Sequence, residues 1–280
     1  MSTSSVTGIL QNISGTLVLA GAGKMGGALL RGWLDLGYPP RQIAVLEPNI
    51  SEEMRGVRDV IGVRFNPPAG DIKDVAFVVL AVKPQVADQI VPGLKYLVGP
   101  NTVVISVMAG KTLRFFEGAL GDRAIVRTIP NTPAAIGRGI TVAVANKKVT
   151  EAQRPVVRRL LAAVGAVEWV DDEALIDAAT AVSGSGPAYV FLLAESLARA
   201  GAAAGLPADL AARLAHATVS GSGELMHQSG VDAATLRENV TSPAGTTAAA
   251  LRVLMAPDGL DPLMEKAVAA ATKRSRELAG

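Results

Sequence analysis

Cysteine is absent from this chain of 280 residues, and histidine occurs only twice. Without cysteine, the protein cannot form a disulfide, a thiolate metal site or a thiol nucleophile. The two histidines, His216 and His227, lie eleven positions apart, which is not the spacing of a helical zinc-binding pair. We therefore expect neither metal catalysis nor a cysteine-based mechanism.

A surplus of charge of one sign is also missing. The chain holds 27 lysine and arginine residues against 25 aspartate and glutamate residues, which gives a formal net charge of +2. No run of lysine or arginine exceeds two residues, whereas nucleic-acid-binding proteins need a concentrated basic surface. The composition favours a small-molecule partner and no nucleic acid.

Long apolar runs are lacking as well. The longest uncharged stretch after the first lysine, 178–194, has 17 residues and includes serine, glycine and proline, whereas a membrane span needs about 20 apolar residues. Residues 1–15 form a polar extension without the basic start and apolar core of a secretory signal. We expect a cytoplasmic protein with no membrane partner.

Short β-branched runs alternate with longer amphipathic stretches from Thr16 to about Val170. This alternation is typical of parallel βα units, and continuously apolar runs suit strands that helices cover on both faces. After Asp171, segments rich in alanine and leucine take over. The sequence predicts an α/β fold, with an N-terminal Rossmann-type doubly wound sheet over 16–170 and an all-helical domain over 171–280. The strands are expected at 16–20, 43–46, 63–65, 75–82, 103–107, 125–128, 140–145 and 167–170.

The helix expected over Pro187–Gly205 carries only Glu195 and Arg199 as charged residues. A helix that is apolar nearly all round needs burial on every side, and a helical domain of about 110 residues has little interior to offer. We therefore expect an obligate homodimer. The alternative is that this helix lies at the centre of its own domain.

The segment Gly21-Ala22-Gly23-Lys24-Met25-Gly26 directly follows the first expected strand and opens a helix. This spacing is the dinucleotide-binding fingerprint. The first glycine makes the tight turn, the second admits the pyrophosphate and the third allows close helix packing. Free amides at the helix start then hold the phosphates. The alternative is that the glycines only connect strand to helix.

Glu47 ends the second expected strand and lies 21 residues after Gly26, close to the position of the acid that binds ribose hydroxyls. A carboxylate there repels the 2′-phosphate of NADP and so favours NADH over NADPH. Arg55 and Arg58 are near enough in the sequence to leave NADPH open. The alternative is an acid at a helix start that binds no ligand.

Two further strand ends are expected at the same crevice, Val82-Lys83-Pro84 and Met108-Ala109-Gly110, because ligands bind outside the carboxyl ends of parallel strands. Lys83 ends an eight-residue apolar run, where a buried cation needs an anionic or carbonyl partner. A coenzyme contact fits this position. The alternative is that Lys83 only marks where the strand meets water.

Three more motifs follow in order: Pro130-Asn131-Thr132-Pro133, Ser183-Gly184-Ser185-Gly186-Pro187-Ala188-Tyr189 and Val240-Thr241-Ser242-Pro243-Ala244-Gly245-Thr246-Thr247. With the fingerprint and Leu80–Gln85, they make the chain resemble pyrroline-5-carboxylate reductases from Gly21 to about Arg252. The resemblance implies that NADPH or NADH reduces the cyclic imine 1-pyrroline-5-carboxylate to L-proline, the last step of proline biosynthesis. It also implies a homodimer and leaves open a larger ring such as a decamer.

The chemistry of the substrate sets what the enzyme must supply. A protonated imine is already electrophilic, so the enzyme needs positioning and charge complementarity rather than a strong acid. Ser242-Pro243 has the pattern of an N-cap followed by proline at the first helical position, which leaves the amides of 244–247 free for the substrate carboxylate. Relatives usually have glycine where Ala244 stands; we expect helical dihedrals there, which alanine tolerates.

The resemblance assigns further roles, with the Thr247 hydroxyl close to the ring nitrogen as the catalytic group. Its substrate-binding residues are Glu173, Ser242, Ala244, Gly245, Thr246 and Thr247. Spacing and resemblance together predict these coenzyme contacts: Gly21, Ala22, Gly23, Lys24, Met25, Gly26, Glu47, Asn49, Asn66, Val82, Lys83, Pro84, Ala109 and Asn239. In the alternatives, Ser242 only caps a helix, Glu173 is a solvated acid and Asn239 is a turn residue.

Two other functions share this domain plan. β-Hydroxyacid dehydrogenases resemble one another in a catalytic lysine with asparagine four residues on, and no lysine of this chain has that neighbour. A non-catalytic NAD(P)-binding or redox-sensing protein is the second alternative. We expect such a protein to have a damaged substrate loop, whereas the segment 242–247 is complete.

Overall fold

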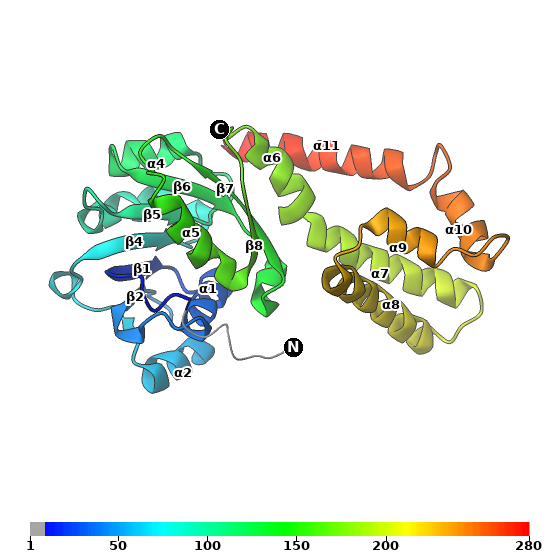
Figure 1. The fold of residues 1–280 in the computed structure, drawn as a ribbon, viewed down its shortest axis with the longest axis horizontal. Helices are drawn as coiled ribbons and strands as arrows, with labels where there is room; N and C mark the ends of the chain where they lie inside the picture. Colours follow the sequence, from blue (N-terminus) through cyan, green and yellow to red (C-terminus); the bar gives the residue numbers. More distant parts are fainter. Residues whose placement is uncertain (1–8, 280) are drawn as a thin grey trace. The chain divides into compact units, whose positions relative to one another are not determined.

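Eight strands form one sheet in the computed structural model, which describes residues 9–279 (Figure 1). Their order is β3-β2-β1-β4-β5-β6-β7-β8. All eight predicted strands are present, with bounds that differ by at most two residues. They are β1 (Thr16–Ala20), β2 (Ile43–Leu46), β3 (Arg64–Phe65), β4 (Val75–Leu80), β5 (Val103–Ser106), β6 (Ala124–Ile129), β7 (Gly139–Ala145) and β8 (Gly165–Trp169).

The first six strands pair in parallel, but β7 runs antiparallel to β6, and β8 is parallel to β7. The expectation of parallel βα units is therefore wrong at the β6–β7 pair. The physical reason is the link between β6 and β7, which holds only the short 3₁₀ helix η5 (Thr132–Ile136). A parallel crossover needs about a dozen residues or more, so the chain turns back instead.

Helices cover both faces of the sheet, as the apolar strands predicted. Leu17 and Leu19 of β1 belong to the same buried cluster as Trp33, and Val18, between them, joins Phe116 in the cluster on the opposite face. The helices of this part are α1 (Lys24–Asp35), α2 (Glu52–Ile61), α3 (Ala87–Ile90), α4 (Leu113–Leu120), α5 (Gln153–Leu161) and α6 (Leu175–Ala179). The strand order reverses between β1 and β4, which places a topological switch point at their carboxyl ends.

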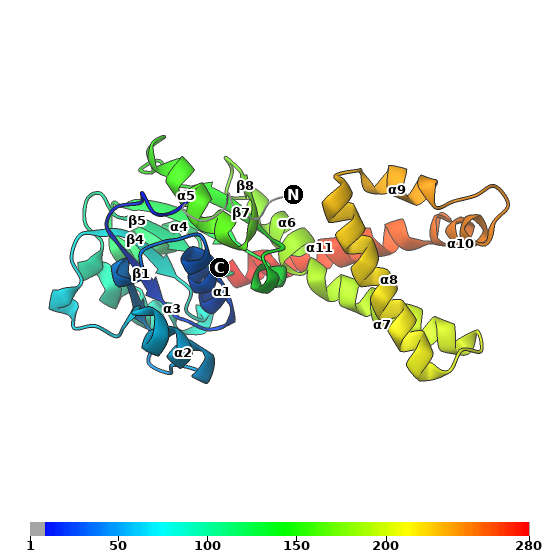
Figure 2. The same ribbon diagram turned by 60° about the horizontal axis from the view of Figure 1, so that its bottom comes forward.

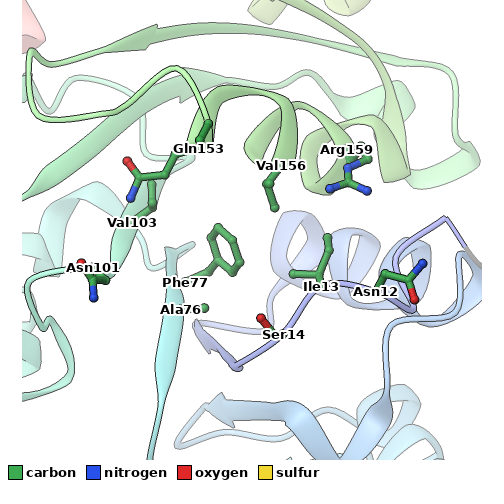
Figure 3. A pocket seen from close by; sticks show the side chains of 11 residues that line it. Asn12, Ile13, Ser14, Ala76, Phe77, Asn101, Val103, Gln153, Val156 and Arg159 are labelled. Atoms are coloured by element: carbon green, nitrogen blue, oxygen red, sulfur yellow. The ribbon is translucent and has the colours of Figure 1, made fainter.

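The segment before β1 is more than a polar extension. Leu10 and Ile13 are buried in the core, and the hydroxyl of the fully buried Tyr38 donates a hydrogen bond of 3.1 Å to the carbonyl of Gly15. Figure 3 shows Ile13 with Phe77 at a cavity of about 240 Å³, at the amino ends of the strands. The predicted extension 1–15 is thus anchored from Leu10 onward, while residues 1–8 lie outside the described part.

By its internal contacts the described chain divides after Gly184, and 272–279 belong with the first unit, while the boundary after 170 remains a prediction. The division falls there because α6 and the following π-helix η7 (Thr180–Gly184) bury Ile176 and Ala181 completely. Ser275 also donates a hydrogen bond of 2.6 Å to Asp177. The rest of the chain is helical, as predicted: α7 (Gly186–Ala203), α8 (Ala208–Ser229), α9 (Ala233–Asn239), α10 (Thr246–Leu254) and α11 (Leu260–Ala279).

Helix α7, which matches the predicted apolar helix, pairs with α8 (Figures 1 and 2). None of its residues is buried within the described chain. Phe191, Leu192 and Leu193 each expose more than half of their surface. Over residues 9–279, no helix is both long and apolar enough to cross a membrane.

Candidate coenzyme and substrate sites

The glycine turn between β1 and α1 has little room for side chains at two of its three glycines. Gly21 has φ +93°, and a Cβ atom there would lie 2.6 Å from the carbonyl oxygen of Ala81. A Cβ atom on Gly26 would overlap the carbonyl oxygen of Gly21, whereas Gly23 faces open space. Each glycine therefore has the steric property that the fingerprint predicted. Gly21 makes the tight turn, Gly26 allows close packing, and Gly23 leaves the approach to the turn open.

A cavity of about 690 Å³ lies beside this turn, at the carboxyl ends of β1, β2 and β4. Seven of the predicted coenzyme residues line it: Gly21, Gly23, Glu47, Asn49, Asn66, Val82 and Lys83. Sequence reasoning missed the other seven lining residues, all apolar, of which Val86, Ile90 and Leu94 follow β4. Their spacing of four residues was a usable signal, since residues four apart share one face of a helical segment.

The other predicted coenzyme residues stand elsewhere. Ala22 and Gly26 are buried beneath the turn, Lys24 is exposed, and Met25 and Pro84 are half-buried without lining the cavity. Ala109 is exposed in the loop after β5, and Asn239 ends α9 in the second unit. Spacing and resemblance predict a coenzyme role for these residues, and those roles remain predictions.

The expectation that Lys83 is a buried cation at the end of a strand is wrong. Strand β4 ends at Leu80, two residues before the predicted end, and Lys83 starts the next 3₁₀ turn with an exposed side chain. It is therefore not a buried cation that needs a partner. Proline at the next position is the physical reason, because it cannot donate to a strand ladder and begins the turn.

The Glu47 carboxylate ties the glycine turn to the end of β2. Its Oε2 accepts a hydrogen bond of 2.8 Å from the amide of Ala22, and its Oε1 accepts one of 2.9 Å from the amide of Asn49. Asn66 holds the Glu47 backbone from both sides, because its Oδ1 accepts from the Glu47 amide and its Nδ2 donates to the Glu47 carbonyl. Each carboxylate oxygen can accept a second hydrogen bond, so the group retains capacity for hydroxyls of a ligand.

The predicted helix start at Ser242-Pro243 is wrong. Residues 242–245 form a turn, closed by a hydrogen bond of 3.1 Å from the Gly245 amide to the Ser242 carbonyl, and α10 begins at Thr246. Ala244 has φ +57°, so the expectation of helical dihedrals there is wrong too. Proline followed by a residue with positive φ is the pattern of a type II turn, which the Ser-Pro pair fits as well as it fits a helix start.

The amides that open α10 are available to a ligand. Gly245 occupies the N-cap position without a side-chain cap. Within the described chain, the amides of Thr246 and Thr247 have no hydrogen-bond acceptor. The first turn of a helix with free amides favours an anion. The anion site predicted for this loop remains a prediction, and the free amides place it at the two threonines rather than over 244–247.

Glu173 neutralises a buried arginine. Its Oε1 accepts hydrogen bonds from Nη1 of Arg127, at 2.7 Å, and from the amide of Leu113 at the start of α4, at 2.8 Å. Arg127 is only 2% exposed, and its Nε and Nη2 have no partner among the described residues. The position of Arg127 within the apolar strand predicted over 125–128 was the sign in the sequence that an acidic partner is needed. The substrate role of Glu173 remains a prediction.

No cluster of three or more residues able to hold a metal ion occurs within residues 9–279. His216 and His227 both lie on α8.

Two family models match the chain, "Pyrroline-5-carboxylate reductase dimerisation" over 173–278 and "NADP oxidoreductase coenzyme F420-dependent" over 16–110. The pyrroline-5-carboxylate reductase of Pseudomonas aeruginosa is 40% identical over 266 residues, which cover 94% of this chain and 96% of that protein. The chain belongs to the pyrroline-5-carboxylate reductase family. The resemblance drawn from the motifs is confirmed.

Solved structures of the pyrroline-5-carboxylate reductase family have the same fold. The reductase of Coxiella burnetii superposes with a TM-score of 0.87 at 34% identity, over 96% of this chain and 100% of that one. The Plasmodium falciparum reductase, solved with NADP bound, has a TM-score of 0.78 at 28% identity, over 97% of this chain and 100% of that one.

Proposed function

We propose that this protein reduces 1-pyrroline-5-carboxylate to L-proline. The observation that carries the proposal is the cavity at the switch point of the sheet, with the glycine turn on its wall, in a chain of this family. A hydride passes from the reduced nicotinamide to the imine carbon of the protonated substrate. The C=N π bond becomes the nitrogen lone pair, and the coenzyme leaves oxidised. Catalysis then depends on positioning and charge complementarity.

The loop before α10 supplies the substrate contacts in this proposal. The free amides of Thr246 and Thr247 suit the substrate carboxylate, because the helix start carries partial positive charge. The Thr247 hydroxyl then lies close to the ring nitrogen and steadies the protonated imine. Thr247→Ala should lower kcat on pyrroline-5-carboxylate with the coenzyme Kd unchanged. Equal kinetics in variant and parent would show that Thr247 has no part in the substrate site.

For the coenzyme, the proposal is a preference for NADH over NADPH. The Glu47 carboxylate lines the cavity, and Lys83 is the single basic residue among the described residues that do so. Arg55 and Arg58 are not among them. A carboxylate beside the adenosine ribose accepts from both hydroxyls of NADH and repels a 2′-phosphate. A preference for NADPH is the competing outcome of the assay, because the Plasmodium falciparum relative was solved with NADP bound.

The assembly in this proposal is a homodimer built through the helical unit. The region 173–278 matches the dimerisation model, and Phe191, Leu192 and Leu193 of α7 expose a contiguous apolar stretch. Exposed apolar patches of this kind mark interaction surfaces. Sedimentation at micromolar concentration should show no stable monomer, and the same run distinguishes a dimer from a larger ring such as a decamer.

The activity is tested by the loss of reduced-nicotinamide absorbance when the purified protein meets pyrroline-5-carboxylate. Parallel reactions with NADH and NADPH at matched concentrations give the preference. Turnover with either coenzyme supports the reductase. A folded, dimeric protein that binds coenzyme and turns over neither would instead be the non-catalytic NAD(P)-binding protein.

A further inference from the structure

Asn66 directly follows the short strand β3 and continues its pairing with β2 beyond the end of the strand. The parallel register of the two strands ends at the pair Val45 and Phe65. The Asn66 amide then donates a hydrogen bond of 2.7 Å to the Val45 carbonyl. The Asn66 side chain accepts from the Glu47 amide at 2.9 Å and donates to the Glu47 carbonyl at 2.8 Å. The carboxamide therefore replaces a neighbouring strand and fixes the backbone of Glu47.

The backbone of Asn66 has an uncommon conformation. Its φ is +47°, in the left-handed region that residues other than glycine rarely adopt, although asparagine tolerates it better than most. Such conformations persist only where the surrounding structure determines them, and they cluster at ligand sites. Asn66 lines the 690 Å³ cavity together with Glu47, so the strained residue lies at a candidate binding site.

Glu47 is consequently held at both of its ends. Asn66 fixes its backbone, while the amides of Ala22 and Asn49 donate to its two carboxylate oxygens at 2.8 and 2.9 Å. All four residues belong to the first unit. A carboxylate that is ordered before binding spares a ligand the loss of side-chain freedom, which costs roughly two- to tenfold in affinity for one flexible side chain.

We propose that Asn66 is a positioning residue that sets the choice between NADH and NADPH through Glu47, rather than through a contact of its own with the coenzyme. The inference rests on the proposed function. A fixed carboxylate at this strand end accepts hydrogen bonds from ribose hydroxyls and cannot turn away from a 2′-phosphate. Releasing the Glu47 backbone should therefore weaken NADH binding and relieve the repulsion of NADPH.

The test uses Asn66→Gly, which removes both side-chain hydrogen bonds to Glu47. Glycine adopts the left-handed conformation without cost and keeps the amide that donates to Val45. Asp74→Gly is the matched control, because Asp74 is likewise an exposed residue with a positive φ, of +52°. Asp74 precedes β4 at the amino end of the sheet and does not line the coenzyme cavity. Both variants place glycine in a left-handed position, but only Asn66 contacts Glu47.

The readout is the Kd of NADH and of NADPH, measured without substrate by the fluorescence of the reduced nicotinamide. For Asn66→Gly we expect the Kd of NADH to rise roughly two- to tenfold while that of NADPH does not rise. For Asp74→Gly we expect both constants at parent values. In a Glu47→Ala background, Asn66→Gly should leave the ratio of the two constants unchanged, because the carboxylate that Asn66 positions is missing.

A parent-like ratio in Asn66→Gly would overturn the inference, as would an equal shift in Asp74→Gly. A shift that persists in full in the Glu47→Ala background would also overturn it, because Asn66 would then contact the coenzyme itself. If Asn66→Gly does not fold, Asn66→Ala replaces it under the same criteria. A parent protein that binds coenzyme but never turns over would instead refute the proposed function, so the two failures are distinguishable.

Discussion

The Arg127–Glu173 pair offers the sharpest test of how the first unit is held together. Replacing Glu173 by glutamine keeps an oxygen for the Leu113 amide but leaves the buried guanidinium of Arg127 without a counter-charge. Removing one partner of a buried ion pair costs about 3–5 kcal/mol. The Glu173 side chain is 29% exposed and water screens the pair there, so we expect about 2–3 kcal/mol for Glu173→Gln.

The assay is urea unfolding followed by tryptophan fluorescence, because both tryptophans, Trp33 and Trp169, lie in the first unit with the pair. The double variant Arg127→Met/Glu173→Gln removes both charges and fills the space with an apolar chain. It should recover most of the lost stability, since apolar replacements of buried pairs are often neutral.

Loss of less than about 0.5 kcal/mol in Glu173→Gln would refute the reasoning, because surface substitutions stay within that range. The kinetics separate the two roles of Glu173. An unchanged KM for pyrroline-5-carboxylate in the folded fraction indicates that the carboxylate serves Arg127. A raised KM at parent stability would instead support the substrate role that the resemblance implies.

Three further predictions concern the coenzyme, the substrate turn and alkaline pH. Glu47→Gln, which keeps an acceptor for the glycine turn, should raise the NADPH-to-NADH ratio of kcat/KM by about tenfold; an unchanged ratio would show that the carboxylate does not meet the 2′ position. Ala244→Gly should stabilise the protein by about 0.5 kcal/mol, because relief of a positive φ outweighs the greater freedom of unfolded glycine; destabilisation in thermal unfolding would contradict this. Burial raises the pKa of Tyr38 from 10.0 to about 12, so the stability that its neutral form contributes is complete below pH 10 and is lost as the pH rises through 12, a loss of roughly 2–3 kcal/mol. Tyr38→Phe should remove that alkaline loss in unfolding curves measured between pH 9 and 12, and an identical loss in parent and variant would rule Tyr38 out.

The strands could be located from the sequence because apolar β-branched runs bounded by glycine and proline leave few other assignments. The direction of the strands could not be predicted, since the hydrophobic pattern of a strand is the same whichever way it runs in the sheet. Strand β7 runs back along β6 because the link after Ile129 is too short for a crossover. The anchoring of Leu10 and Ile13 was hidden for a related reason. Two apolar residues in a polar segment show no period, and only the tertiary contacts bury them.

The candidate site, too, could be predicted from the sequence only in part. The glycine turn was predictable because its glycines meet local steric requirements. At Gly21 and Gly26, a Cβ atom would come too close to backbone atoms. The start of α10 was not, because Ser242-Pro243 fits both a cap and a turn, and the distinction lies in the positive φ of Ala244. The hydrogen bonds between Asn66 and Glu47 span 19 positions, a distance over which single-sequence patterns carry no information.

Product analysis decides whether this chain is a working reductase. Purified protein is incubated with pyrroline-5-carboxylate and either NADH or NADPH, while coenzyme oxidation and proline formation are measured together. We predict one L-proline for each coenzyme oxidised, with the larger kcat/KM for NADH. Folded, dimeric protein that binds the coenzyme yet forms no proline would contradict it.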